Sequence, residues 1–397
     1  MIENKVFCMM PWIHMHVWPA GTVYPCCMAD PELPIGDLNN NSIYQIWNSN
    51  SMKNLRKNIL ANKRSPECKR CYELEENNIH TLRLSSNENF KHRLEKIHST
   101  KEDGSVEKFN MYYMDIRVSN LCNLKCRSCG PQLSSSWYED HISLHGDIQQ
   151  QKILKVNKNF VKDLYPLLLD VERVYWAGGE PLITEEHYDI LDFWIDNNKT
   201  NIKLDYTTNF TQMRYKKKTI FEYWNFFKSV RVAASLDANY KKGEFLRKNI
   251  SWSQIVQNRK DMIKECPDVY FEITPTVSVY NVFNLPDFHK EWIEAGLLRP
   301  ENWRINILLD PVYMRLQILP IELKKSVTKK YENHIKYLEQ FPNTKNVIDG
   351  YNSILSFMSV GREKEIHRFK IKTKLLDELR NENFRDVFPE LTEIAYE

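Results

Sequence analysis

Between residues 111 and 310 the chain alternates short apolar runs with longer stretches that have helical periodicity. Stretches such as 186–197 and 253–265 repeat their apolar positions every three to four residues and are predicted as helices. The intervening runs are rich in β-branched and aromatic residues. They predict six strands, over residues 112–119, 171–179, 201–209, 229–238, 269–278 and 303–310. Strand–helix alternation predicts an α/β fold with a parallel sheet, and six units are too few for a closed eight-stranded barrel.

The segments on either side of this region have different patterns. Residues 321–397 are charged, with Glu/Lys pairs four positions apart, and predict a C-terminal helical extension. Near the N-terminus, GTVYPCC predicts a β-hairpin with Gly21 at its turn, and the following segment predicts a short strand or turn entering a helix that ends at the Cys68–Cys71 pair. We therefore expect a small α+β domain over 1–80, a connector over 81–109, a main domain over 110–320 and the extension over 321–397.

Overall charge gives little indication of a partner. Lys and Arg number 55 against 52 Asp and Glu, and a net charge of +3 does not by itself imply a nucleic acid. The run Lys216–Lys218 is typical of a solvated loop. No secretory signal and no apolar stretch of membrane-spanning length is evident, so we expect a soluble, cytoplasmic protein with no membrane partner. In that setting nine cysteines favour metal ligation over disulfides.

Three of these cysteines, Cys122, Cys126 and Cys129, lie in the run SNLCNLKCRSCG with the spacing C-x3-C-x2-C. Iron–sulfur clusters are normally held by thiolates, and a four-iron cluster with three of them has one iron open to a small molecule. Three buried structural cysteines are an alternative, but polar residues surround them. A zinc site is a second alternative, although zinc usually takes paired C-x2-C ligands and a nearby fourth ligand.

With this motif the chain resembles the radical S-adenosylmethionine (SAM) superfamily over roughly residues 110–310. The resemblance implies a partial (β/α)6 barrel of the TIM type and a [4Fe-4S] cluster whose open iron binds SAM. It also implies reductive cleavage of SAM to a 5′-deoxyadenosyl radical that abstracts hydrogen from a substrate. The run GGEP resembles the family motif whose backbone binds the SAM amino group. The cofactor-binding residues implied are Gly178, Gly179, Glu180, Pro181, Asn209, Ser235, Asp237 and Arg247, with the ribose assigned to Asn209, Ser235 and Asp237 and the SAM carboxylate to Arg247.

A second group of cysteines occupies residues 1–80. Its pattern resembles the twitch form of the SPASM auxiliary domain, which implies a second [4Fe-4S] cluster fully ligated by Cys8, Cys26, Cys68 and Cys71. Zinc is the alternative metal here as well. Cys27 could replace Cys26 or be a neighbouring core thiol, and Cys266 is interpreted as structural. The auxiliary domain usually follows the barrel in the family, whereas here it precedes it.

A fully ligated auxiliary cluster suits electron transfer in a two-electron oxidation. We expect oxidation or modification of a peptide, with a reductant such as flavodoxin or ferredoxin. Modification of a nucleoside or carbohydrate is the enzymatic alternative, and a non-catalytic iron–sulfur or zinc protein is the alternative of another class. Asp310, at the end of the sixth predicted strand, is the candidate base that removes a proton from substrate.

Overall fold

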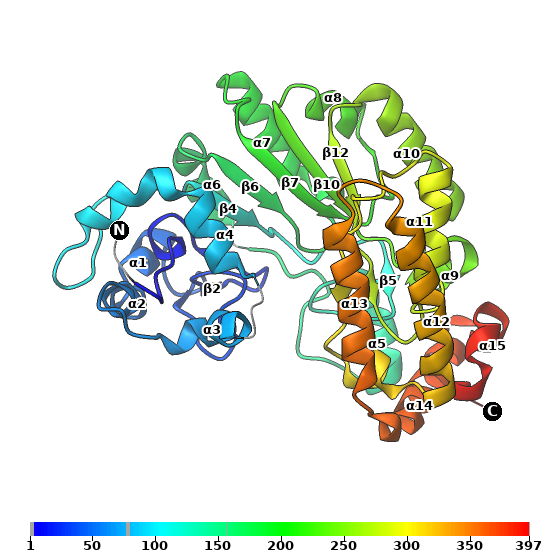
Figure 1. The fold of residues 1–397 in the computed structure, drawn as a ribbon. Helices are drawn as coiled ribbons and strands as arrows, with labels where there is room; N and C mark the ends of the chain where they lie inside the picture. Colours follow the sequence, from blue (N-terminus) through cyan, green and yellow to red (C-terminus); the bar gives the residue numbers. More distant parts are fainter. Residues whose placement is uncertain (1–3, 77–79, 157, 397) are drawn as a thin grey trace. The chain divides into compact units, whose positions relative to one another are not determined.

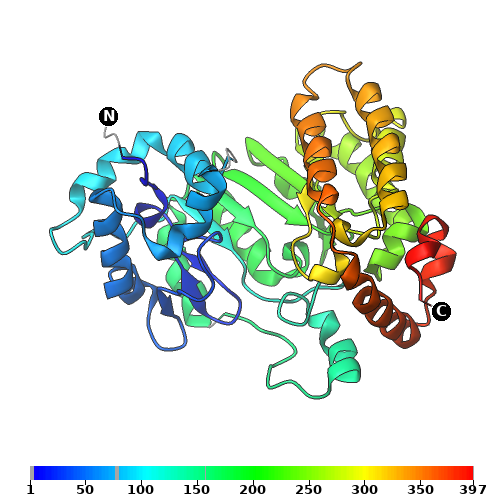
Figure 2. The ribbon, with the colours of Figure 1, turned by 60° about the horizontal axis from the view of Figure 1, so that its bottom comes forward.

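The computed structural model describes residues 4–76, 80–156 and 158–396. They form two compact units. The first unit takes its residues from 1–120, 153–205 and 226–229, and the second from 121–152, 206–225 and 230–397. Figures 1 and 2 show the ribbon in two orientations.

The first unit is built on strands in the order β3-β2-β1-β4-β6. The strands are β1 (His16–Val17), β2 (Thr22–Tyr24), β3 (Gly36–Asp37), β4 (Tyr113–Ile116) and β6 (Arg173–Trp176), and β7 (Lys203–Thr208) begins in this unit and ends in the second. The predicted hairpin is present as β1 and β2, with Gly21 at a φ of +97° in its turn. Its first strand pairs in parallel with β4, placing His16 opposite Asp115. The N-terminal segment and the first barrel strand therefore share one sheet.

Two helices cover one face of this sheet. Because side chains alternate along a strand, Met114 and Ile116 point to the face opposite Asp115. They line a small cavity together with Phe160 of α6, and Trp176 packs against His187 of α7 with ring centroids 4.6 Å apart. The helices of this unit are α1 (Ile43–Trp47), α2 (Asn50–Leu60), α3 (Lys69–Glu76), α4 (Leu82–Asn89), α6 (Lys158–Leu168) and α7 (Glu185–Asp196).

The second unit contains the end of β7 followed by a parallel pair of strands, β10 (Ser229–Ala234, from Val230 onward) and β12 (Tyr270–Ile273). The amide of Ser235 donates to the carbonyl of Thr208, so β7 and β10 end side by side. A further parallel pair joins β13 (Thr276–Val277) to β14 (Asn306–Ile307). The remaining short strands are β5 (Lys125–Cys126), β8 (Arg214–Tyr215), β9 (Lys218–Thr219) and β11 (Arg247–Lys248).

Helices make up most of the second unit. They are α5 (Tyr138–His145), α8 (Ile220–Trp224), α9 (Tyr240–Leu246), α10 (Trp252–Glu265), α11 (Leu285–Glu294), α12 (Ile321–Leu338), α13 (Lys345–Ser359), α14 (Ile366–Arg380) and α15 (Phe384–Val387). The long helices α12 and α13 run beside each other in Figures 1 and 2. Their inner faces bury Tyr331 and Tyr351, whose rings meet edge to face at 5.3 Å. The predicted C-terminal helices are thus present.

The α/β fold class with the strand–helix alternation of a partial barrel is confirmed, and each of the six predicted strands contains an observed one. Two local predictions were wrong. The helix expected to end at the Cys68–Cys71 pair ends at Leu60, and the pair instead lies at the start of the next helix, α3. The sixth strand is only Asn306–Ile307, because the chain bends away before Asp310.

Candidate functional site

The loop that carries Cys122, Cys126 and Cys129 is held by its own backbone and by the segment after it. The hydroxyl of Ser136 donates to the carbonyl of Cys122 at 2.6 Å, and the indole of Trp137 donates to the carbonyl of Cys126 at 2.7 Å. The amide of Cys129 donates to the carbonyl of Cys126 at 3.0 Å. Strand β5 also pairs with β11, which places Cys126 opposite Arg247. These contacts fix the conformation of the loop.

The three thiols of this loop lie close enough to influence one another. Burial, with contributions from Cys126 and Cys122, raises the pKa of the Cys129 thiol to about 12. Burial also raises the pKa of Cys126, although the nearby Arg247 guanidinium opposes that rise. Thiolates at these positions become favourable once positive charge or a metal is present. The three sulfurs and their cationic neighbour fit a thiolate-ligated cluster.

The polar residues assigned to SAM in the second unit gather around this loop, and several of them bind one another. The guanidinium of Arg247 is paired with the carboxylate of Asp237 (Nε–Oδ2 2.8 Å, Nη2–Oδ1 3.0 Å), and its Nη1 lies 3.5 Å from the Cys126 sulfur. The amide nitrogen of Asn209 donates to Asn123 at 2.8 Å and lies 4.0 Å from the Cys122 sulfur. Ser235 directly follows β10 and is half-buried.

The GGEP run lies in the first unit, directly after β6. Gly178 has a φ of +116°, and a Cβ there would lie 3.1 Å from the carbonyl oxygen of Ser119. The amide of Gly179 donates to that same carbonyl at 3.1 Å. The carboxylate of Glu180 is buried and accepts from the amide of Leu182, while Pro181 opens a short 3₁₀ helix. Position 178 therefore requires a glycine, because of its backbone conformation and because the segment that follows β4 approaches it closely.

Asp310 is exposed and lies three residues after the end of β14. The residue after it, Pro311, lines a cavity of about 150 Å³ together with Tyr313 and Cys129. Burial, reinforced first by Tyr280 and then by Asp310, raises the pKa of the Tyr313 hydroxyl to about 12. Asp310 thus directly precedes a residue that lines a cavity bordering the cysteine loop.

In the first unit, Cys8, Cys26, Cys68 and Cys71 come from four separate places in the chain. Cys8 precedes a 3₁₀ helix, Cys26 follows β2, Cys68 ends the 3₁₀ helix Pro66–Cys68, and Cys71 lies in the first turn of α3. The amide of Asp30 donates to the carbonyl of Glu67 at 3.0 Å, which ties the Cys26 turn to the Cys68 turn. The fold therefore brings the segments of all four cysteines together.

The charged groups that act on Cys26 and on Cys27 differ in part. Burial, with a contribution from Cys71, raises the pKa of Cys8 to about 11, and burial with Cys8 and Cys71 raises that of Cys68. Cys27, Cys8 and Cys68 all add to the effect of burial in raising the pKa of Cys26. The charged groups that act most on Cys27 are instead Asp115 and Arg117.

Two residues that sequence reasoning did not identify hold the Cys8 segment in place. Arg83 of α4 donates to the carbonyl of Phe7 at 2.7 Å and makes an ion pair with Glu75 of α3. Asn87 donates to the same carbonyl and accepts from the amide of Met9, both at 2.8 Å. Both residues lie in the segment predicted only as a connector. Their spacing, an arginine and an asparagine four residues apart and so on one face of a helix, was the available signal.

The four thiols fit a four-iron cluster by the chemistry of their donors. In such a cluster each thiolate binds a different iron, so the sulfurs must surround the group rather than meet at one atom. Across the residues that the structure describes, no three His, Cys, Asp or Glu side chains lie close enough together to hold a single metal ion. Cys266 is 1% exposed in the second unit, in keeping with its structural interpretation.

Comparison with known proteins bears on the four cysteines of the first unit. Residues 8–72 match the SPASM family of iron–sulfur cluster-binding domains. The chain carries a SPASM domain. This match spans all four cysteines assigned to the auxiliary cluster, and the predicted resemblance to radical SAM proteins with such a domain is confirmed. The match supports an iron–sulfur cluster as a cofactor of residues 8–72.

Beyond the SPASM domain, the similarities are more distant. A GTP 3′,8-cyclase of Campylobacter curvus is 27% identical over 135 residues, which is 34% of this chain and 37% of that protein. The structure of anSMEcpe with bound AdoMet shares 19% identity over 58% of this chain and 59% of that one, with a TM-score of 0.39. Streptococcus suis SuiB bound to S-adenosylmethionine shares 15% identity over 83% and 69% of the two chains, also at 0.39. The chain thus spans little more than a third of the cyclase and under two thirds of anSMEcpe.

Within residues 4–76, 80–156 and 158–396, no helix is both long and apolar enough to cross a membrane.

Proposed function

We propose that this protein is a radical SAM enzyme that modifies or oxidises a peptide, with the SPASM-domain cluster as electron acceptor. The observation that carries this proposal is the cysteine loop itself. Its three cysteines lie on one short loop, and a buried guanidinium lies 3.5 Å from the sulfur of Cys126. Cys122, Cys126 and Cys129 would hold a [4Fe-4S] cluster through three irons. When bound, that cluster and SAM supply reductive cleavage of SAM and hydrogen-atom abstraction from substrate.

The chain's own residues would bind and orient SAM. The SAM ammonium group is a hydrogen-bond donor, so the backbone carbonyls of Gly178, Gly179, Glu180 and Pro181 are suitable acceptors. Asn209 and Ser235 end neighbouring strands of the second unit and are proposed to bind the ribose. Arg247 and Asp237 already pair with each other, so we propose that Asp237 orients Arg247 while the guanidinium reaches the SAM carboxylate with its remaining N–H groups.

The SPASM domain would hold a second [4Fe-4S] cluster through Cys8, Cys26, Cys68 and Cys71. The coupling of Cys26 to Cys8 and Cys68, while Cys27 is influenced mainly by Asp115 and Arg117, favours Cys26 as the ligand. With four protein ligands no iron is left for substrate, so this site suits electron transfer. Asp310 would take the proton that leaves the substrate, since the residue after it, Pro311, lines the cavity next to Cys129.

The peptide substrate class is part of this proposal. One solved structure similar to this chain is SuiB bound to the precursor peptide SuiA, at 16% identity and a TM-score of 0.38. The specific observation that favours a second candidate is the 135-residue similarity to GTP 3′,8-cyclase, which makes a nucleotide the alternative substrate. We further propose a cytoplasmic location and a flavodoxin or ferredoxin as reductant.

One experiment tests the class of reaction. The protein, reconstituted anaerobically with iron and sulfide, is reduced with dithionite in the presence of SAM, and 5′-deoxyadenosine is quantified. We expect several turnovers with the native chain and none with Cys126→Ala. A native chain that binds iron but yields no 5′-deoxyadenosine would contradict the proposal and favour a non-catalytic iron–sulfur protein.

A further inference from the structure

The C-terminal part of the chain makes direct contact with the cysteine loop inside the second unit. Arg127, between Cys126 and Cys129, is 3% exposed, and its Nη2 donates to both Asp377 of α14 and Glu382, the latter at 2.5 Å. Its Nε donates to the carbonyl of Phe245 at 3.2 Å. A residue within the ligand loop is thus ion-paired to two carboxylates more than 200 positions later in the sequence.

A second connection runs through Asp140 of α5. Its carboxylate accepts from Lys125 at 2.6 Å and from Arg380 of α14 at 2.9 Å. The guanidinium of Arg380 also lies 4.6 Å from the ring centroid of Trp137, the residue whose indole donates to the carbonyl of Cys126. The residues on both sides of Cys126 are therefore connected to the same C-terminal helix.

The C-terminal side of these contacts is itself fixed. Asp377 is 1% exposed and accepts from the amide of Phe384 at 2.8 Å and from the hydroxyl of Tyr396 at 2.6 Å. Glu382 accepts from Lys248 at 2.8 Å, on the strand that pairs with β5 of the cysteine loop. One buried and one half-buried carboxylate, each with more than one donor, can hold the guanidinium of Arg127 in one orientation.

We propose that residues 377–396 form a C-terminal clamp that fixes the ligand geometry of the cysteine loop, with Asp377 as its main positioning residue. Ligand side chains must be held closely in their productive geometry, and partners one step beyond the ligands commonly change metal affinity by about 10- to 100-fold. The clamp provides that support to Cys126 and Cys129 from residues that never touch the cluster. The identity of the group that the loop binds rests on the proposed function. The clamp itself is inferred only from contacts between protein residues.

The test measures how fast the loop thiols react in the full-length protein without metal. Reduced protein is treated with iodoacetamide under argon, and labelling of each cysteine is followed by peptide mass spectrometry. In Asp377→Asn and in Arg127→Gln we expect Cys126 and Cys129 to react about tenfold faster or more. Glu390→Gln is the matched control, because it removes a 2.5 Å ion pair between the same C-terminal segment and Lys242 of α9 without touching the loop. It should leave the loop rates unchanged.

Cys266, which is 1% exposed and lies outside the loop, reports general loosening of the unit. The clamp is overturned if neither variant accelerates the loop thiols, or if Cys266 accelerates as much as they do in both. Tyr396→Phe removes one hydroxyl and leaves no buried charge unpaired, so it should give a smaller acceleration, confined to the loop. The double variant Arg127→Gln/Asp377→Asn should match the single variants, since all three remove the same link.

Iron binding separates this proposal from the proposed function. In loaded protein, iron of the loop cluster should be released to a chelator about 10-fold faster or more in Asp377→Asn, while iron of the SPASM domain should leave at the native rate. If the loop binds no iron in the native chain, the proposed function fails, and the labelling result still decides the clamp.

Discussion

Arg247 and Asp237 form a two-point ion pair in which both side chains are nearly inaccessible to solvent, and the same guanidinium lies 3.5 Å from the sulfur of Cys126. A carboxylate, a guanidinium and a prospective cluster ligand are thus arranged in series. Because the low dielectric of the interior makes an unpaired charge costly, neither member of the pair can be removed alone without consequence.

Asp237→Asn should therefore destabilise the protein by about 3–5 kcal/mol, since Arg247 would remain buried with its main counter-charge gone. Urea unfolding followed by tryptophan fluorescence measures this. The exposed pair between Asp287 and Lys330 supplies a control, and Asp287→Asn should change stability by no more than about 1 kcal/mol. Equal losses of unfolding free energy in the two variants would show that the buried pair stabilises the protein no more than the exposed one.

Metal content tests the assignment of two clusters. Anaerobically reconstituted protein should contain about eight irons per chain, and the triple variant Cys122/Cys126/Cys129→Ala should keep about four, because the SPASM ligands are untouched. Iron and zinc are measured by plasma emission spectrometry. Zinc in place of iron at the SPASM site would contradict the auxiliary cluster.

The adjacent pair Cys26 and Cys27 allows a comparison at one turn of the chain. Cys26→Ser should lose the auxiliary cluster, whereas Cys27→Ser should retain it, because Cys8 and Cys68 both act on the Cys26 thiol, while Asp115 and Arg117 act most on Cys27. EPR of the reduced protein distinguishes the two clusters. The reverse pattern would make Cys27 the ligand.

The role of the SPASM cluster in electron transfer is tested by Cys68→Ala. This variant should still cleave SAM to some extent, because the loop cluster is intact, but should lose substrate turnover. Adding substrate to the native protein should leave the EPR signal of the auxiliary cluster nearly unchanged. Normal turnover in Cys68→Ala would show that the cluster is dispensable.

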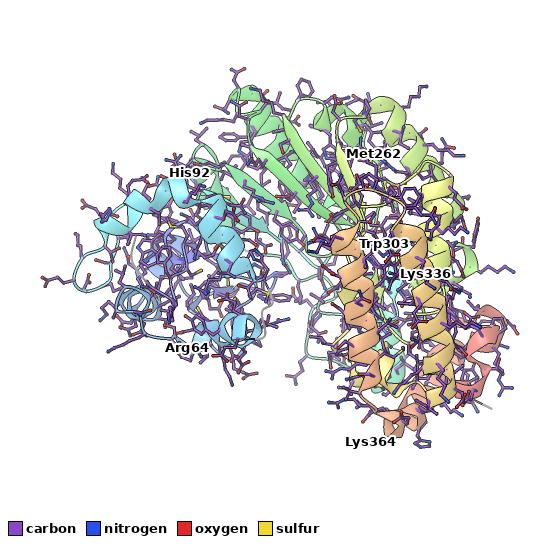
Figure 3. All side chains as sticks on the ribbon, in the orientation of Figure 1. Arg64, His92, Met262, Trp303, Lys336 and Lys364 are labelled. Atoms are coloured by element: carbon purple, nitrogen blue, oxygen red, sulfur yellow. The ribbon has the colours of Figure 1, made fainter. Side chains whose placement is uncertain are left out.

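Two buried histidines make stability depend on pH. His289 of α11 donates from Nε2 to the carbonyl of Pro300, so its Nδ1 accepts from His334 of α12 at 3.1 Å; Trp303, labelled in Figure 3, stacks on its ring. Burial lowers the pKa of His334 to about 4 from 6.5, and it also lowers the pKa of His289 well below 6.5. As pH falls from about 6.5 to 4, these histidines therefore become protonated in the unfolded chain but stay neutral in the folded chain. The free energy of unfolding decreases over that range.

Between pH 7 and pH 5 the loss attributable to His334 is about 2 kcal/mol. His334→Gln, which cannot take up a proton, should reduce the pH dependence of the unfolding free energy by about that amount. Urea titrations of both proteins at the two pH values make the comparison. An unchanged pH dependence would mean that His334 is protonated in the folded protein.

Asp310→Asn keeps the size of the side chain and removes its basicity. Iron content and 5′-deoxyadenosine formation should remain normal, while oxidised product falls by about 10²-fold or more, the usual range for a proton-transfer group. Liquid chromatography with mass spectrometry measures both products. Normal product yield would eliminate Asp310 as the base and direct attention to other groups along the cavity near Cys129.

The sequence predicted what is encoded locally. The strands could be placed because β-branched and aromatic runs mark them, and the ligand cysteines because short spacings such as C-x3-C-x2-C are chemically restrictive. The pairing of Arg127 with Asp377 could not be foreseen, since 250 positions separate them and many charged residues compete as partners. The sequence predicts Cys68 and Cys71 as ligands. Their place at the start of α3 depends on where α2 ends, and short-range sequence patterns determine the end of a helix only weakly.

The parallel pairing of β1 with β4 bears on how such proteins can be rearranged. In this chain the SPASM domain is not a separate module joined only by a linker, because strand β1 of its hairpin pairs with the first barrel strand and places His16 opposite Asp115. A chain starting at residue 110 would expose the edge of β4, and exposed edges promote aggregation. Exchanging this domain with that of a relative would require cutting through a sheet, so we expect chimaeras joined between residues 81 and 109 to be insoluble unless the hairpin travels with the barrel.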